Sequence, residues 1–237
     1  MRKLLIIRLL CLWAVFATSA GNAADDPRKI FESAAHAFEV NYREAWSFTE
    51  ERQRKGVTWV GRWDPRDSRH WTLLSVDGHE PSASERDTYQ HDKAEEMDRQ
   101  KDRDQSPTAM VTSSSLKLLD ETADAWHFRF QPRGEGDNAR IMKDLTGTMT
   151  IAKRGPVITM IEVYNMAPFK PKFGFKVRKF LSRFDFARAP DGPMVPIHAD
   201  FQISAKAIGL MNIDERVTVE YRDYAKVDPS RGIHSDP

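Results

Sequence analysis

Residues 194–208, MVPIHADFQISAKAI, alternate strictly between apolar and polar positions. The odd positions carry Val195, Ile197, Ala199, Phe201, Ile203 and Ala205. The even positions carry Pro196, His198, Asp200, Gln202, Ser204 and Lys206. Successive side chains of a β-strand point to opposite faces, so this pattern predicts a strand with one buried face and one face in water.

Seven further segments have the residue types and alternation of strands. They cover residues 57–63, 69–76, 125–131, 145–152, 157–165, 174–188 and 213–224. Short turn sequences join several of them, namely DPRD at 64–67, KRGP at 153–156 and PDGP at 190–193. These eight segments, together with less regular stretches such as the one around residues 114–117, give about nine or ten strands. The alternation of strands and helices that marks a parallel sheet is missing. The chain is therefore predicted to form an antiparallel meander.

An amphipathic helix is predicted ahead of the strands, over residues 28–46. Asp25, Asp26 and Pro27 suit the first turn of a helix, where acids and an early proline are favoured. Apolar residues then recur at spacings of three and four, which places one apolar stripe on one side of the helix. The stripe consists of Ile30, Phe31, Ala34, Ala35, Phe38, Tyr42, Ala45 and Trp46.

Residues 82–105 interrupt the strands with an almost wholly charged segment. Ser82 and Glu85 have the spacing of a capping box, which predicts that a helix begins here. Tyr89, Ala94 and Met97 are its main apolar support. A solvated helix or partly disordered excursion is one interpretation, and a mobile lid or partner-docking arm is the other.

These elements predict an α+β protein that is mostly β. A sheet of this width tends to curl, and its alternation predicts one dry face and one wet face. We expect a curved antiparallel meander forming an unclosed half-barrel, with the N-terminal helix and the charged helical excursion on or near its concave side. Residues 25–237 are expected to form this single domain.

Residues 1–24 have the pattern of a secretory signal peptide. Basic residues at positions 2, 3 and 8 precede an apolar run from Leu9 to Ala17, and small residues follow up to Ala24. A retained anchor is the alternative interpretation. This order predicts export to the periplasm, with full secretion left open and no further segment that could span the membrane.

Removal of that leader changes the charge and the chemistry of the chain. The leader holds three of the 36 basic residues, which leaves 33 basic and 35 acidic side chains, and it holds the single cysteine, Cys11. A near-neutral chain is not drawn to nucleic acid by its net charge. Without cysteine it forms no disulfide and no thiolate site.

The motif search predicts no catalytic or metal site and no cofactor. The seven histidines include no HExxH pair, and no GxSxG, GxGxxG or P-loop sequence is present. Ser114 and Lys117 spell S-x-x-K, a pattern common by chance. The strand carboxylates Glu162, Asp185, Asp200 and Asp223 show no sign of pairing in a cleft. We therefore expect a protein that is not an enzyme.

Residues 170–183 form a basic stretch without a single acid. Its cations are Lys170, Lys172, Lys176, Arg178, Lys179 and Arg183. Such a surface could attract anionic lipid or an acidic protein face, or it could simply be the wet side of a strand. The apolar parity also switches between Val177 and Phe180, which predicts a β-bulge.

The predicted dry face is too large for one helix to cover. Its candidate ligand-binding residues are Trp59, Trp63, Trp126, Phe128, Phe130, Met149, Ile151, Phe184, Phe186, Phe201, Ile203, Val217 and Val219. The face could enclose an apolar cavity that accepts acyl chains, or it could be filled by the protein's own side chains.

An exported chain with an N-terminal helix, a long antiparallel meander and a final YRDY strand resembles the periplasmic lipoprotein carriers of the LolA/LolB-like superfamily. The resemblance lies in the order of elements. It implies an open sheet capped by helices, with a lipid-binding concave face. The leading hypothesis is a soluble periplasmic protein that shields a lipid, acyl chain or lipoprotein there. The alternatives are an envelope protein–protein interaction or stress-sensing module, and a hydrolase whose site no motif reveals.

Overall fold

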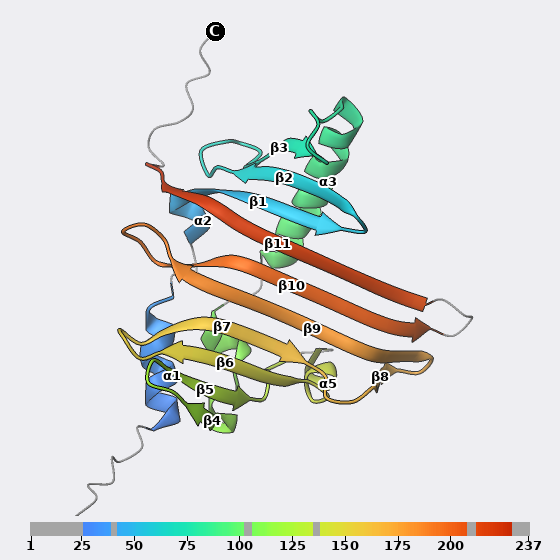
Figure 1. The fold of residues 1–237 in the computed structure, drawn as a ribbon. Coiled ribbons are helices and arrows are strands. Elements are labelled where there is room, and N and C mark those ends of the chain that lie inside the picture. Colours follow the sequence, from blue (N-terminus) through green and yellow to red (C-terminus); the bar gives the residue numbers. More distant parts are fainter. Residues whose placement is uncertain (1–25, 39–41, 102–105, 135–137, 208–211, 229–237) are drawn as a thin grey trace, which may run out of the picture.

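The computed structural model describes residues 26–38, 42–101, 106–134, 138–207 and 212–228. The predicted leader, residues 1–24, lies outside this range. The described chain forms one large antiparallel sheet with a few helices, and the sheet does not close on itself, as Figure 1 shows. The mostly β fold class predicted from the alternation is confirmed.

The first part of the chain contains two short helices, three strands and one long helix. Their bounds are α1 Pro27–His36, α2 Tyr42–Ala45, β1 Trp46–Arg54, β2 Val57–Trp63, β3 Trp71–Val76 and α3 Ala83–Gln100. The next part holds α4 Pro107–Met110, a 3₁₀ turn at Ser113–Ser115, β4 Lys117–Glu121, β5 Ala125–Phe130 and α5 Asn138–Met142. The remainder is β6 Thr146–Ala152, β7 Val157–Tyr164, β8 Phe169–Lys172, β9 Phe175–Arg188, β10 Met194–Ala207 and β11 Asn212–Lys226.

The strands are ordered β3-β2-β1-β11-β10-β9-β7-β6-β5-β4, and β8 pairs with β9 alone. Neighbours along the chain are mostly neighbours in the sheet, as a meander requires. The exceptions are β7, which pairs with β9, and the first strand, β1, which pairs with the last, β11. The two edges are therefore β3 and β4, and α3 lies on the chain path that joins them.

The N-terminal helix begins where predicted but is shorter than predicted. Asp26 caps it by accepting a hydrogen bond from the backbone N–H of Arg28 at 3.0 Å, and Pro27 follows. The helix ends at His36, and Trp46 opens β1 opposite Lys226. The prediction of one helix over 28–46 is wrong because Trp46 and the residues after it find a strand partner in β11.

Three strands were not predicted, and each lacks the apolar alternation that marks the others. The second half of β1 reads EERQR, every residue of β4 is exposed, and β8 has only four residues. The bulge predicted between Val177 and Phe180 is confirmed. Lys179 pairs with Ser204 and Val177 pairs with Ala205, which leaves Arg178 as the extra residue.

The charged segment forms α3, capped as its sequence predicts. Ser82 donates its backbone N–H to Glu85 at 2.8 Å and accepts from the N–H of Glu85 at 3.3 Å. Tyr89 is buried and Met97 packs against the same hydrophobic cluster, whereas Ala94 is exposed. In the described part of the chain no helix is long and apolar enough to cross a membrane.

Candidate functional site

One face of the sheet is apolar across most of its width, and strand pairing defines it. Residues directly opposite each other in an antiparallel pair share a face. One row of such partners runs through Arg52, Val219, Ala199, Phe184, Ile161, Met149 and Phe128. Helices α1 and α3 both pack on this side, so we call it the helical face.

All thirteen candidate ligand-binding residues lie on the helical face, as the register of their strands requires. Those that are buried are Trp63, Phe128, Phe130, Met149, Ile151 and Val219. Those that keep partial exposure are Trp59, Trp126, Phe184, Phe186, Phe201, Ile203 and Val217. The alternation therefore placed these residues on the correct face of the sheet. Their exposure divides them into a buried group and a partly exposed group.

The two main helices cover opposite sides of the helical face. Residues of α1 pack with the buried side chains of β5, β6 and β7 in one hydrophobic cluster. Tyr89 of α3 packs with aromatic residues of β1, β2 and β3 in another. Figure 1 shows the two helices well apart, with β9, β10 and β11 running between their positions.

Three half-buried apolar side chains occupy this central region. Phe184, Phe201 and Val217 belong to none of the four hydrophobic clusters formed by the described residues. The rings of Phe184 and Phe201 meet edge to face at 5.2 Å between centroids. We call these three residues the central apolar strip.

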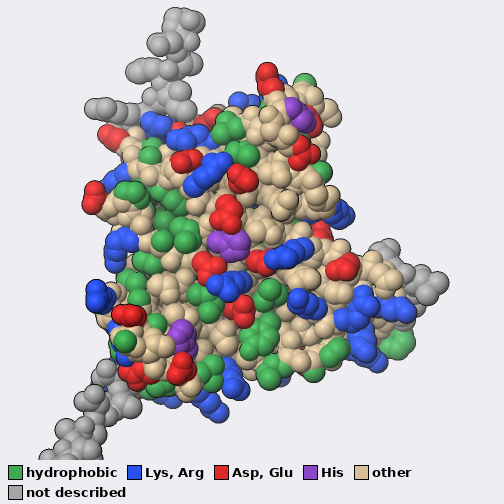
Figure 2. Space-filling view, viewed as in Figure 1, with side chains coloured by type: hydrophobic (Ala, Val, Ile, Leu, Met, Phe, Trp, Pro, Cys, Tyr) green, Lys and Arg blue, Asp and Glu red, His purple; other side chains and the backbone are tan. Residues whose placement is uncertain are grey.

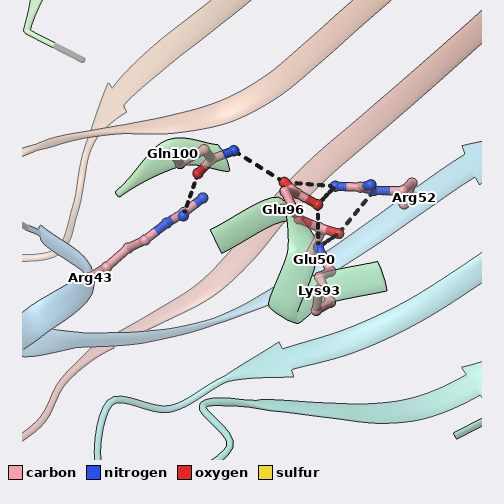
Figure 3. Close-up of polar contacts among 6 residues, drawn as sticks. All are labelled: Arg43, Glu50, Arg52, Lys93, Glu96 and Gln100. Carbon is pink, nitrogen blue, oxygen red and sulfur yellow. Dashed lines mark hydrogen bonds and ion pairs between the residues drawn. The ribbon is translucent and has the colours of Figure 1, made fainter. Parts of the chain in front are cut away.

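Helix α3 is attached to the helical face mainly through ionised side chains (Figure 3). Lys93 Nζ lies 2.7 Å from Glu50 Oε1, and both side chains are almost fully buried. Arg52 reaches Glu50 at 3.1 Å and Glu96 at 3.0 Å. Glu50 and Arg52 come from β1, whereas Lys93 and Glu96 come from α3. These four residues form what we call the ion-pair cluster.

Two further contacts extend this attachment. Gln100 donates to Glu96 at 3.3 Å and accepts from Arg43 at 3.0 Å, which joins the end of α3 to α2. Lys93 Nζ also lies 3.9 Å from the ring centroid of Trp71, close enough for a cation–π interaction. Charge, rather than a broad apolar stripe, thus holds this helix on the sheet.

Burial and charge shift the pKa values within the ion-pair cluster in opposing ways. Burial lowers the pKa of Lys93 more than the neighbouring Glu50 raises it. Burial alone would raise the pKa of Glu96, but Lys93, Arg52 and Arg43 outweigh it and hold this pKa below the usual range. Buried charges are retained only when they are paired, which is the arrangement seen here.

Sequence reasoning missed the ion-pair cluster because each member has the residue type of a solvated surface. Lys93 stands in a run of charged residues, and Glu50 begins the charged half of β1. One signal was available. Lys93 lies four residues after Tyr89 and four before Met97, on the side of the helix that carries its apolar residues.

The predicted basic stretch is only partly a single surface. Arg183 lies further along β9 and is paired with Asp185 at 2.8 Å. Lys170, Lys172 and Lys176 do gather, beside the turn between β8 and β9, and they line a hollow of about 680 Å³. Arg140 of α5 and Lys206 of β10 complete its basic lining, and neither was among the candidates.

Two hollows on the described part of the chain do not coincide with the candidate apolar residues. None of the thirteen lines the basic hollow or a second hollow of about 600 Å³. The second one is bounded by Phe38, Trp46, Asp191 and Lys226 among others. The apolar candidates therefore line neither hollow: some are buried beneath the helices, and the central ones lie between them.

The strand carboxylates that were weighed as acids or bases are mostly committed to arginines. Asp185 pairs with Arg183, Asp200 with Arg216 at 2.7 Å, and Asp223 with Arg222 at 3.4 Å. Among the described residues no group of three or more histidine, cysteine, aspartate or glutamate side chains is placed to hold a metal ion.

Comparison of the chain with protein-family models, with curated proteins and with solved structures gave no match.

Proposed function

We propose that this protein binds an acyl chain, carried by a lipid or a lipoprotein, on the helical face of its sheet. The observation that carries the proposal is the central apolar strip. Phe184, Phe201 and Val217 lie on the middle strands with no covering hydrophobic cluster among the described residues. Burial of such side chains by an apolar guest is favourable at roughly 25 cal/mol for each Å² removed from water.

The flanking helices support a ligand at this position. Helix α1 is fixed by its own hydrophobic cluster, and α3 is fixed by the ion-pair cluster, so each side of the strip has an independent wall. The walls are of different kinds. An apolar ligand would contact apolar side chains on the side of α1 and the aliphatic stems of charged residues on the side of α3.

The test is direct measurement of bound lipid. Native mass spectrometry and solvent extraction of the purified chain are expected to recover an acyl lipid. Replacement of Phe184 and Phe201 by serine should reduce the recovered lipid and the binding of a fluorescent fatty acid. Leu119→Ser, at an exposed leucine of the edge strand β4, is the matched control and should change neither.

Two results would overturn this proposal. One is wild-type protein that carries no lipid and takes up no fatty acid. The other is equal lipid recovery from the double serine variant, with circular dichroism showing that it is folded. A partner protein recovered by crosslinking in place of lipid would favour the interaction-module hypothesis.

The same proposal places the protein in the periplasm, on the strength of the leader pattern in residues 1–24. Cell fractionation should find a processed chain there. Deletion of residues 2–23 should leave the chain in the cytoplasm, whereas an unchanged distribution would contradict the export signal.

A further inference from the structure

The turn between β8 and β9 carries a second surface that the apolar strip does not explain. Its cations line the hollow of about 680 Å³, and no acidic residue contributes to that lining. We call this surface the basic hollow. It consists of Arg140, Lys170, Lys172, Lys176 and Lys206, all of them exposed. Figure 2 shows basic side chains gathered at this end of the sheet, in the lower right of the view.

These cations differ from the paired arginines on the middle strands of the sheet. Arg183, Arg216 and Arg222 each have an acidic partner within 3.1 Å. Among the described residues no ion pair reaches any member of the basic hollow. Their charge is therefore not neutralised within the described part of the chain.

The pairing of β9 with β10 adds a second observation. Lys176 and Lys206 are direct partners in the register. Like charges placed opposite each other destabilise a sheet, and an external anion between them would relieve the repulsion. The position thus favours the approach of a negatively charged surface.

The third observation is an aromatic side chain at the tip of the same hairpin. Phe173 is 96% exposed, the highest exposure among the large hydrophobic residues described. Lys172 pairs with Phe175, so the turn consists of Phe173 and Gly174 alone. Gly174 has a φ of 78°, a left-handed conformation that glycine adopts without strain, and the tight turn carries the ring beyond the sheet.

We propose that this hairpin docks on a bilayer that contains anionic phospholipid. Phe173 enters the interfacial layer, and the lysines of the basic hollow lie over the headgroup phosphates. Aromatic rings prefer the boundary between headgroups and acyl chains, and basic residues add attraction near an anionic surface. An acidic protein surface would pair with the charges equally well, but it would not explain why the Phe173 ring protrudes into solvent.

This docking is independent of the acyl ligand proposed for the central apolar strip, because the two use different residues. The test is flotation of the purified chain with vesicles of phosphatidylcholine alone or mixed with phosphatidylglycerol. Binding is expected only to the mixed vesicles and should disappear at high salt.

Two variants separate charge from the aromatic wedge. Lys176→Gln with Lys206→Gln should weaken binding to the mixed vesicles by about thirty-fold, since each basic residue near an anionic surface contributes about a kilocalorie per mole. Phe173→Ser should weaken it while the dependence on salt stays the same. Arg28→Gln with Lys29→Gln removes the same charge from exposed positions of α1 and should leave binding unchanged.

Three outcomes would overturn the docking proposal. The first is no binding to the mixed vesicles. The second is equal loss in the Arg28/Lys29 control, which would mean attraction by net charge alone. The third is binding that inorganic phosphate abolishes and Phe173→Ser leaves intact, which would indicate a site for a free anion. Loss of vesicle binding with bound lipid retained would leave the acyl-ligand proposal standing.

Discussion

At the scale of single residues, the most informative side chain is Lys93. Its side chain is only 4% exposed, and it bonds Glu50, which is equally hidden. Removing one partner from a buried pair leaves the other charge without compensation, and that loss is larger than the net stabilisation the pair provides. We therefore expect the pair to fix the position of α3 on the sheet more than to add net stability to the fold.

Lys93→Met tests this view of the buried pair. The substitution keeps an unbranched side chain of nearly the same length but removes the ammonium group, which leaves Glu50 with Arg52 as its remaining partner. The free energy of unfolding should therefore fall by about 3 kcal/mol. Lys93→Met with Glu50→Gln should lose less than the single variant. Urea denaturation measures both, with Lys101→Met as the exposed control. A double variant less stable than the single one would contradict this account.

Gly61 tests how closely α3 approaches the sheet. A Cβ atom at this position would lie 1.9 Å from Tyr89 Oη and 2.8 Å from Cζ, so Tyr89 packs directly on the backbone of β2. Gly61→Ala should destabilise the protein by about 1–3 kcal/mol by displacing that ring.

The same substitution in a Tyr89→Ala background should have little further effect, because the ring is gone. Thermal unfolding of the single and double variants measures the coupling. If Gly61→Ala destabilised the protein equally in both backgrounds, Gly61 and Tyr89 would not be in contact.

At the scale of elements, α3 behaves as a helix attached by charge. Its sequence offers few apolar contacts, and the ion-pair cluster supplies the remaining attachment. The arrangement makes that attachment sensitive to protonation of Glu96. A carboxyl whose pKa is lowered in the folded state contributes stability above its unfolded pKa, and this contribution is lost as the pH falls through the folded value.

The expected result is a loss of stability that begins as the pH falls below about 4.5, the ordinary value for this side chain. Glu96→Gln should lower stability at neutral pH and flatten this acid limb. Glu95→Gln, on the exposed side of α3, should keep the acid limb of the wild type. Urea denaturation across the pH range measures the three proteins, and identical acid limbs in all of them would contradict the role of Glu96.

Elements with an apolar face could be predicted from the sequence, and those held by polar contacts could not. Residues 194–207 alternate because one side of β10 faces the helices, and the strand follows the pattern except at Ile197. Ile197 is 38% exposed because the register with β9 shifts at this point. In β1 the same inward face carries Glu50 and Arg52, so the alternation is absent although the strand lies inside the sheet. Phe201 and Val217 could be assigned to the dry face because they fall on the apolar positions of alternating strands. Their location between the regions covered by α1 and α3 depends on the strand order, which the local sequence pattern does not encode.

At the scale of the whole molecule, the defining feature is that β11 lies between the two parts of the sheet. On one side it pairs with β1, and on the other with β10. Every other strand belongs to a run of neighbours in sequence, from β1 to β3 or from β4 to β10. The sheet is therefore continuous only through its last strand.

Proline substitutions test this strand order. Thr218 of β11 is paired with both Gln53 and Asp200, so Thr218→Pro should lower stability by about 3 kcal/mol or more. Leu119→Pro lies in the edge strand β4, where the register skips Leu119, and should have a much smaller effect. Thermal unfolding measures both variants. A similar loss in the two would contradict the central place of β11.

The position of β11 also affects how the chain folds while it is being synthesised. Of the strands described, β11 is synthesised last. Until it is present, the edges of β1 and β10 that pair with it have no partner. Bare edges of that kind invite pairing with other chains. Newly made copies are therefore expected to be prone to aggregation until β11 pairs, and a chain truncated before residue 212 should stay prone to it.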